Sequence, residues 1–139
     1  MRDGMTKTQT QAIGGLGDIA DRYDGYIVDL WGVMHDGVRA FSEAVDCLAQ
    51  LKRRGARIAM LSNAPRRAAM AADRSAAIGV VPALYDRMIT SGEDCWQALD
   101  REPPGRRALF IRAGWDNNFL DGLDIAPVDD PANADFVLC

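Results

Sequence analysis

The chain has 139 residues, of which 48% are hydrophobic and 26% charged, and its formal net charge is -4 at pH 7, values typical of a soluble globular domain. The mild acidity argues against nucleic-acid binding, and no apolar run is long enough for a signal peptide or a membrane span, so we expect a cytoplasmic protein. The three cysteines are widely spaced and predict neither a disulfide framework nor a zinc site.

The first 25 or so residues are expected to hold little regular structure. Residues 1–12 are polar and rich in Thr and Gln, which predicts a disordered tail. Residues 13–23 contain three glycines but also apolar residues at helical spacing, which indicates a short, marginal helix. A dinucleotide-binding fold is disfavoured, because the glycines of residues 14–17 precede the first strand instead of following it.

The most informative segment is residues 26–37, an apolar run that reaches an aspartate and then a Gly-rich turn. Its β-forming residues lack polar alternation, which predicts the first strand of a parallel sheet, covered on both faces. Asp29 then stands at the carboxyl end of the strand, where ligands bind in open α/β sheets. A carboxylate at this point can attack a phosphorus atom or hold a cation.

A helix and a second strand follow this turn. The helix is predicted over residues 41–54, with an apolar face and Ser42 as its N-cap. Residues 56–61 form a buried strand that ends immediately before Ser62 and Asn63.

Three further elements are predicted before the next break in the chain. They are a helix from Pro65 to about residue 78, a strand over residues 85–90 and a helix capped by Ser91. The alternation of strands and helices predicts an α/β fold with a doubly wound, mostly parallel sheet. Right-handed crossovers would place the carboxyl ends of the three strands along one edge of that sheet.

A second block begins near residue 103, where two prolines and a glycine break the helix. It is predicted to contain a strand over residues 107–111, a short helix over residues 117–120 and a loop over residues 124–134. Residues 135–139 begin another apolar strand and stop. A buried strand needs ladder partners and a following loop, so we expect the chain to be a fragment of a longer protein.

Three segments resemble motifs of the haloacid dehalogenase-like superfamily, most closely its NagD-like branch of sugar and nucleotide phosphatases with a class IIA cap. Residues 26–37 resemble motif I: Asp29 matches, but Trp31 stands where those phosphatases carry a second aspartate. Residues 61–65 resemble motif II, and residues 89–93 resemble a Thr-Ser-Gly segment of the third strand. The order and spacing of the three segments are more specific than any one of them.

This resemblance implies a domain organisation. Residues 13–102 would form the N-terminal part of a Rossmann-like core, and residues 103–139 the beginning of an inserted α/β cap domain. The family's lysine and further acidic metal ligands would follow the cap, beyond these 139 residues. Caps of this branch often take part in dimer contacts, so the resemblance leaves a homo-oligomer open. These residues define neither the oligomeric state nor the substrate.

The resemblance further implies roles for individual residues. Asp29 would be the nucleophile that forms an aspartyl-phosphate with a small phosphorylated metabolite. The carboxylate of Asp29 and the backbone carbonyl of Trp31 would bind Mg²⁺. The hydroxyl of Ser62 and the amide of Asn63 would bind the phosphate, beside the start of the helix at Pro65. The alternative is that Asp29 caps a turn and that Ser62 and Asn63 cap a helix.

Trp31 separates two functional hypotheses. The aspartate that it replaces acts as general acid and base in the family, and the loss of such a group costs roughly 10²–10⁴-fold in rate. Trp31 itself is expected to pack or to contact the cap, while His35 and Asp36 are the nearby residues that could transfer protons instead. The leading hypothesis is a Mg²⁺-dependent phosphatase that is weak or inactive as this fragment. The alternative is a regulatory protein that binds a phosphate ligand without hydrolysis.

Overall fold

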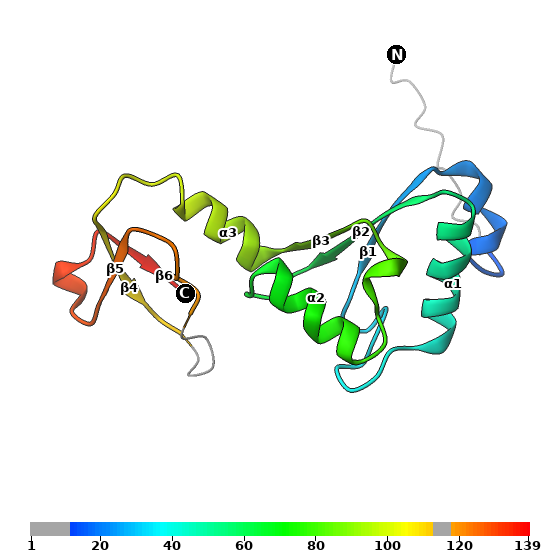
Figure 1. The fold of residues 1–139 in the computed structure, drawn as a ribbon, viewed down its shortest axis with the longest axis horizontal. Coiled ribbons are helices and arrows are strands. Elements are labelled where there is room, and N and C mark those ends of the chain that lie inside the picture. The colour runs from blue at the N-terminus through cyan, green and yellow to red at the C-terminus, as the bar shows by residue number, and fades with distance from the viewer. Residues whose placement is uncertain (1–11, 113–117) are drawn as a thin grey trace, which may run out of the picture.

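The computed structural model describes residues 12–112 and 118–139 and contains two three-stranded parallel sheets (Figure 1). The predicted tail, except for residue 12, lies outside the described residues. No helix of the described residues is long and apolar enough to span a bilayer. The elements are, in chain order, β1 (Gly25–Asp29), α1 (Ser42–Arg53), β2 (Arg57–Ser62), α2 (Ala68–Ala77), β3 (Arg87–Thr90), α3 (Ser91–Leu99), β4 (Arg106–Phe110), β5 (Ile125–Val128) and β6 (Phe136–Leu138).

This alternation of helices and parallel strands confirms the predicted α/β class. The marginal helix predicted over residues 13–23 is present as two short 3₁₀ helices, Leu16–Asp18 and Ala20–Arg22. The first sheet has the strand order β1-β2-β3, so its strands follow one another in space as they do in sequence.

One face of the first sheet packs against α1. Ile58 and Met60 of β2 are buried on this face, together with Leu48 and Leu51 of α1, in a single apolar cluster. The apolar spacing along residues 42–53 is therefore the reason that α1 docks on the sheet.

The opposite face of this sheet is open among the described residues. Ile27, Leu61 and Ile89, one from each strand, are 76%, 47% and 42% exposed. The prediction that the first strand is covered on both faces is wrong for the described chain. β1 is an edge strand, and its side chains alternate between the α1 face and the open face.

The predicted N-caps Ser42 and Ser91 are instead the first residues of α1 and α3. The capping positions belong to Phe41 and Thr90, whose backbones are extended. Thr90 makes the capping interaction itself, because its Oγ1 accepts the backbone N–H of Glu93 at 3.0 Å.

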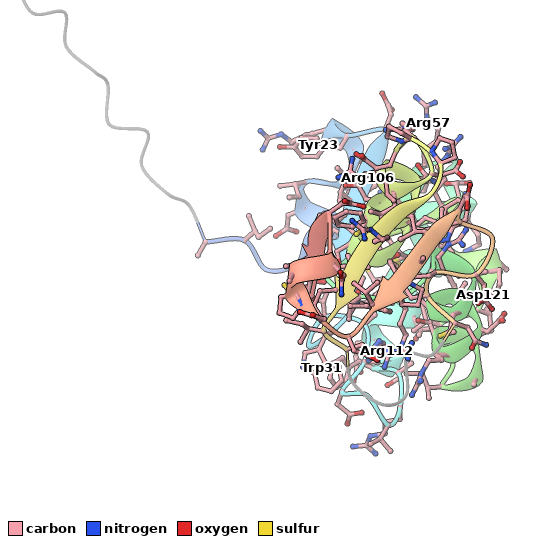
Figure 2. All side chains as sticks on the ribbon, turned by 90° about the vertical axis from the view of Figure 1, so that its left-hand side faces the viewer. Tyr23, Trp31, Arg57, Arg106, Arg112 and Asp121 are labelled. Atoms are coloured by element: carbon pink, nitrogen blue, oxygen red, sulfur yellow. The ribbon has the colours of Figure 1, made fainter. Side chains whose placement is uncertain are left out.

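Helix α3 connects the first sheet to the second, in which β4 lies between β5 and β6 (Figure 1). Figure 2 views the molecule from the side of this second sheet. The strands predicted over residues 107–111 and 135–139 are present as β4 and β6.

Two predictions for this block are wrong. Residues 124–134 were expected to be a loop, but β5 forms there because Pro127 is tolerated in an edge strand. Residues 118–120 form turns instead of the expected short helix, and residue 117 lies outside the described residues. The assignment of residues 103–139 to the start of a cap domain stays a prediction.

Candidate active site

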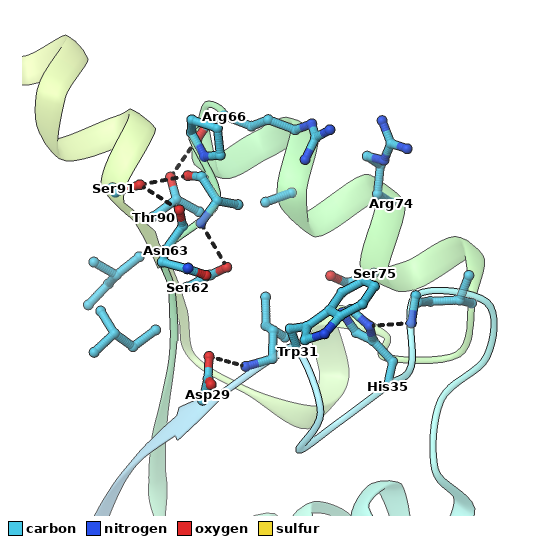
Figure 3. Close-up of a pocket in the computed structure, with 18 of the residues that line it drawn as sticks. Asp29, Trp31, His35, Ser62, Asn63, Arg66, Arg74, Ser75, Thr90 and Ser91 are labelled. Carbon is cyan, nitrogen blue, oxygen red and sulfur yellow. Dashed lines mark hydrogen bonds between the residues drawn. The ribbon is translucent and has the colours of Figure 1, made fainter. Parts of the chain in front are cut away.

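The predicted site residues lie at the carboxyl ends of β1 and β2, which are neighbours in the sheet. The parallel register pairs Asp29 with Leu61, so Ser62 lies one residue further along the adjacent strand. A cavity of about 1430 Å³ opens at this edge and is lined by Asp29, Trp31, Ser62 and Asn63 (Figure 3). The structure therefore brings all four predicted residues to one cavity.

Asp29 lines this cavity and is exposed. Its Oδ1 accepts the backbone N–H of Leu30 at 2.8 Å, and Leu30 is buried, which fixes the chain immediately after the strand. Within the described residues, Oδ2 of Asp29 accepts no hydrogen bond. If Asp29 caps the turn, only Oδ1 is used for this purpose, and Oδ2 can still bind a cation or attack a phosphorus atom.

Ser62 and Asn63 present two hydrogen-bond donors beside this carboxylate. The Oγ of Ser62, a nearly buried residue, accepts the N–H of Ala64 at 3.2 Å, so its own proton can be donated to a ligand. The backbone N–H of Asn63 donates to no acceptor in the described part of the chain. A hydroxyl and an amide so placed can bind two oxygens of a phosphate.

The loop that carries these donors, residues 63–66, is held by the start of α3. Thr90 donates its hydroxyl to the carbonyl of Arg66 at 2.6 Å, and Ser91 donates its hydroxyl to the carbonyl of Ala64 at 3.0 Å (Figure 3). The backbone N–H of Gly92 also donates to the Ala64 carbonyl at 3.1 Å. The third segment of the resemblance thus has a physical role, because it fixes the loop between β2 and α2, called the β2–α2 loop below.

The start of α2 is not where the sequence predicts it. The helix begins at Ala68 instead of Pro65. Its first N–H donates to the carboxylate of Glu93 at 3.0 Å, and Glu93 also forms a 2.8 Å ion pair with Arg67. The hydrogen bond from the Arg67 guanidinium has the largest effect on Glu93, and the hydrogen bond from the backbone N–H of Ala68 adds to it. Together they lower the pKa of Glu93 to about 2. The predicted helix start at Pro65 is therefore wrong, and Glu93 occupies the terminus of α2. The binding of phosphate by Ser62 and Asn63 stays a prediction.

The three residues considered for proton transfer or packing have different surroundings. Trp31 is 66% exposed, so the described residues do not bury it as a packing residue. His35 lines the cavity, and its Nδ1 accepts the N–H of Gly37 at 3.0 Å. Asp36 does not line the cavity. Hydrogen bonds from the backbone N–H groups of Arg39, which has the larger effect, and Val38 lower the pKa of Asp36. His35 is therefore the better placed candidate for proton transfer.

The donor set for a metal ion is small. Among residues 12–112 and 118–139 no group of three or more His, Cys, Asp or Glu side chains could hold a metal ion. The Asp29 carboxylate and the Trp31 carbonyl, which accepts no backbone hydrogen bond from the described chain, offer two oxygen donors. Mg²⁺ is commonly bound by one or two carboxylates together with water and substrate phosphate, so these donors fit part of a Mg²⁺ site.

Arg74 also lines the cavity, and the sequence did not point to it. It lines the cavity from α2, and its guanidinium forms no ion pair with an acidic residue of the described chain (Figure 3). A positive charge there favours an anionic ligand. Arg74 and its neighbour Ser75 both line the cavity. The sequence does not tell which face of α2 is turned toward the cavity, so it could not single out Arg74.

Known structures share this arrangement of strands and helices. A haloacid dehalogenase-like hydrolase from Brucella suis 1330 is 33% identical, with a TM-score of 0.79 over 89% of this chain and 46% of that chain. NagD from E. coli K-12 is 28% identical, with a TM-score of 0.60 over 83% of this chain and 45% of that chain. The glycerol phosphate phosphatase of Mycobacterium tuberculosis in complex with magnesium is 25% identical, with a TM-score of 0.62 over 86% and 36%.

The chain thus spans less than half the length of each of these structures. No curated protein is similar enough to add to these matches. A family model for haloacid dehalogenase-like hydrolases matches residues 26–126, which include Asp29, Ser62 and the start of α3. This match covers most of the chain, and the chain belongs to the haloacid dehalogenase-like hydrolases.

Proposed function

We propose that the protein is a Mg²⁺-dependent phosphatase of a small phosphorylated metabolite and acts through an aspartyl-phosphate. The observation that supports this proposal is that the carboxylate of Asp29 and the donors of Ser62 and Asn63 line one cavity from adjacent strand ends. The similarity to a phosphatase solved with magnesium, at 25% identity, supports the same reaction class.

In the proposed reaction an oxygen of Asp29 attacks the phosphorus atom of the substrate. The bond from phosphorus to the leaving-group oxygen breaks, and its electron pair stays on that oxygen. The Ser62 hydroxyl and the Asn63 amide donate hydrogen bonds to the phosphoryl oxygens, and Arg74 adds positive charge. Water then attacks the same phosphorus atom, which releases inorganic phosphate and restores the carboxylate.

Mg²⁺ held by the Asp29 carboxylate and the Trp31 carbonyl would neutralise negative charge on the phosphate. The remaining chemistry is limited by the side chain of Trp31, which can neither protonate a leaving group nor activate water. We therefore propose slow turnover, and weak turnover by these 139 residues alone. Trp31 is also the observation that favours the second candidate function, the binding of a phosphate ligand without hydrolysis.

Steady-state hydrolysis of p-nitrophenyl phosphate in the presence of Mg²⁺ tests the proposal, alongside calorimetric binding of inorganic phosphate. Asp29→Asn should abolish turnover, whereas the control Asp46→Asn, on the exposed side of α1, should not change it. Ser62→Ala should weaken phosphate binding. Turnover that survives Asp29→Asn would overturn the proposal, and phosphate binding without any turnover would establish the second candidate function.

A further inference from the structure

Trp31 is a large aromatic side chain that the described residues leave mostly exposed. The residues around it in sequence, Leu30 and Met34, are buried and anchor the turn after β1. Trp31 between them is 66% exposed and lines the cavity beside Asp29. Its indole N–H donates to no acceptor of the described chain. Figure 3 shows the indole ring beside the ring of His35.

The ring is nevertheless held in a defined orientation. A Cβ atom at Gly37 would lie 2.6 Å from the Cη2 atom of Trp31, so the six-membered ring lies directly against a residue that must lack a side chain. Gly37 also has a φ of 91°, which disfavours other residues there. The His35 ring meets the indole edge to face, with centroids 5.9 Å apart and an interplanar angle of 88°. An exposed aromatic surface fixed in this way is preorganised for a ligand.

We propose that Trp31 stacks on an aromatic leaving group, so that the site selects aryl phosphate monoesters. This inference rests on the proposed function and names the substrate class of the same site. The phosphate binds at Ser62 and Asn63, while the ring of the substrate lies on the indole at the mouth of the cavity.

The chemistry of the cleavage step favours an aromatic ring over a sugar ring. No carboxylate at position 31 protonates the leaving group, so the leaving oxygen must accept the electron pair of the broken bond as an anion. A phenol has a pKa of about 10, well below that of an aliphatic alcohol, so a phenolate leaves far more readily. One residue, Trp31, thus both removes the general acid and supplies the surface that binds a substrate able to react without it.

Calorimetric binding of four probes measures this preference: phenyl phosphate, glucose phosphate, glycerol phosphate and inorganic phosphate. Trp31→Ala should weaken the binding of phenyl phosphate about 10-fold and leave that of inorganic phosphate unchanged. Trp31→Phe should restore most of the loss. Tyr23→Ala is the matched control, because Tyr23 is half exposed but does not line this cavity.

A second measurement separates direct contact from a structural effect. The indole N–H resonance of Trp31 should shift on addition of phenyl phosphate and stay in place on addition of glycerol phosphate. Equal weakening of all phosphates by Trp31→Ala, or a larger loss for glucose phosphate, would overturn the inference and leave the proposed function intact. Failure of wild-type protein to bind inorganic phosphate would overturn the proposed function, and the inference with it.

Discussion

Replacing Gly92 with alanine should loosen the β2–α2 loop from the start of α3. An added Cβ at Gly92 would overlap the backbone nitrogen of Arg66 and lie 2.6 Å from its carbonyl oxygen. Both are backbone atoms, so no change of rotamer relieves the overlap, and the loop and the helix must separate. That movement would stretch the hydrogen bonds from Gly92 to Ala64, at 3.1 Å, and from Thr90 to Arg66, at 2.6 Å.

The expected cost follows from these contacts. Overpacking of a close contact typically costs 1–3 kcal/mol, and weakening a neutral hydrogen bond costs about 1 kcal/mol more. Alanine at a helical position regains up to about 1 kcal/mol relative to glycine. We therefore expect Gly92→Ala to lower the free energy of unfolding by about 2 kcal/mol. Because the displaced loop carries the Asn63 amide, binding of inorganic phosphate should weaken as well.

Urea unfolding followed by circular dichroism measures the stability, and calorimetry measures the binding of inorganic phosphate. Gly17→Ala is the control, because a Cβ there would have no atom within 4 Å. It should change the free energy of unfolding by less than about 0.5 kcal/mol. If Gly92→Ala matched Gly17→Ala in both measurements, the claim that α3 holds the β2–α2 loop would be refuted.

Three further predictions concern the core, the pH dependence and proton transfer. Leu48→Ala in the buried face of α1 should lower the free energy of unfolding by about 2–5 kcal/mol in urea titrations, and a loss below 1 kcal/mol would contradict the packing described here. The ion pair with Arg67 lowers the pKa of Glu93 from 4.5 to about 2, so its stabilisation is complete above pH 4.5 and is lost as the pH falls toward 2. Urea midpoints measured across this range should therefore fall less steeply in Glu93→Gln than in the wild type, and equal slopes would exclude the pair as a source of acid sensitivity. If His35 activates the water that hydrolyses the aspartyl-phosphate, His35→Ala should abolish turnover of an aryl phosphate, and unchanged turnover would exclude that role.

The core of the fold could be predicted because its pattern is local. The apolar run that ends at Asp29 and the apolar face of residues 42–53 each carry their own periodicity, and parallel strands with right-handed crossovers then bring Asp29 and Ser62 to one edge. Had these side chains been at opposite ends of the sheet, the enzymatic interpretation would have failed. The structure places them at the same end.

The features that the sequence did not reveal depend on contacts between distant residues. Helix α2 begins three residues later than predicted because the carboxylate of Glu93, from the next helix, binds its first N–H. The exposure of Ile27 depends on what covers the second face of the sheet, which an apolar run cannot specify. The orientation of the Trp31 ring depends on Gly37, six residues further along the chain.

The central claim is that Asp29 accepts the phosphoryl group in the cavity formed with Ser62. Its most direct test is acid quenching of the protein after mixing with Mg²⁺ and p-nitrophenyl phosphate, followed by intact-mass and peptide mass spectrometry. One phosphoryl group should appear on the peptide containing Asp29 and be absent from Asp29→Asn. Phosphorylation of another residue, or none in protein that binds inorganic phosphate, would contradict the account.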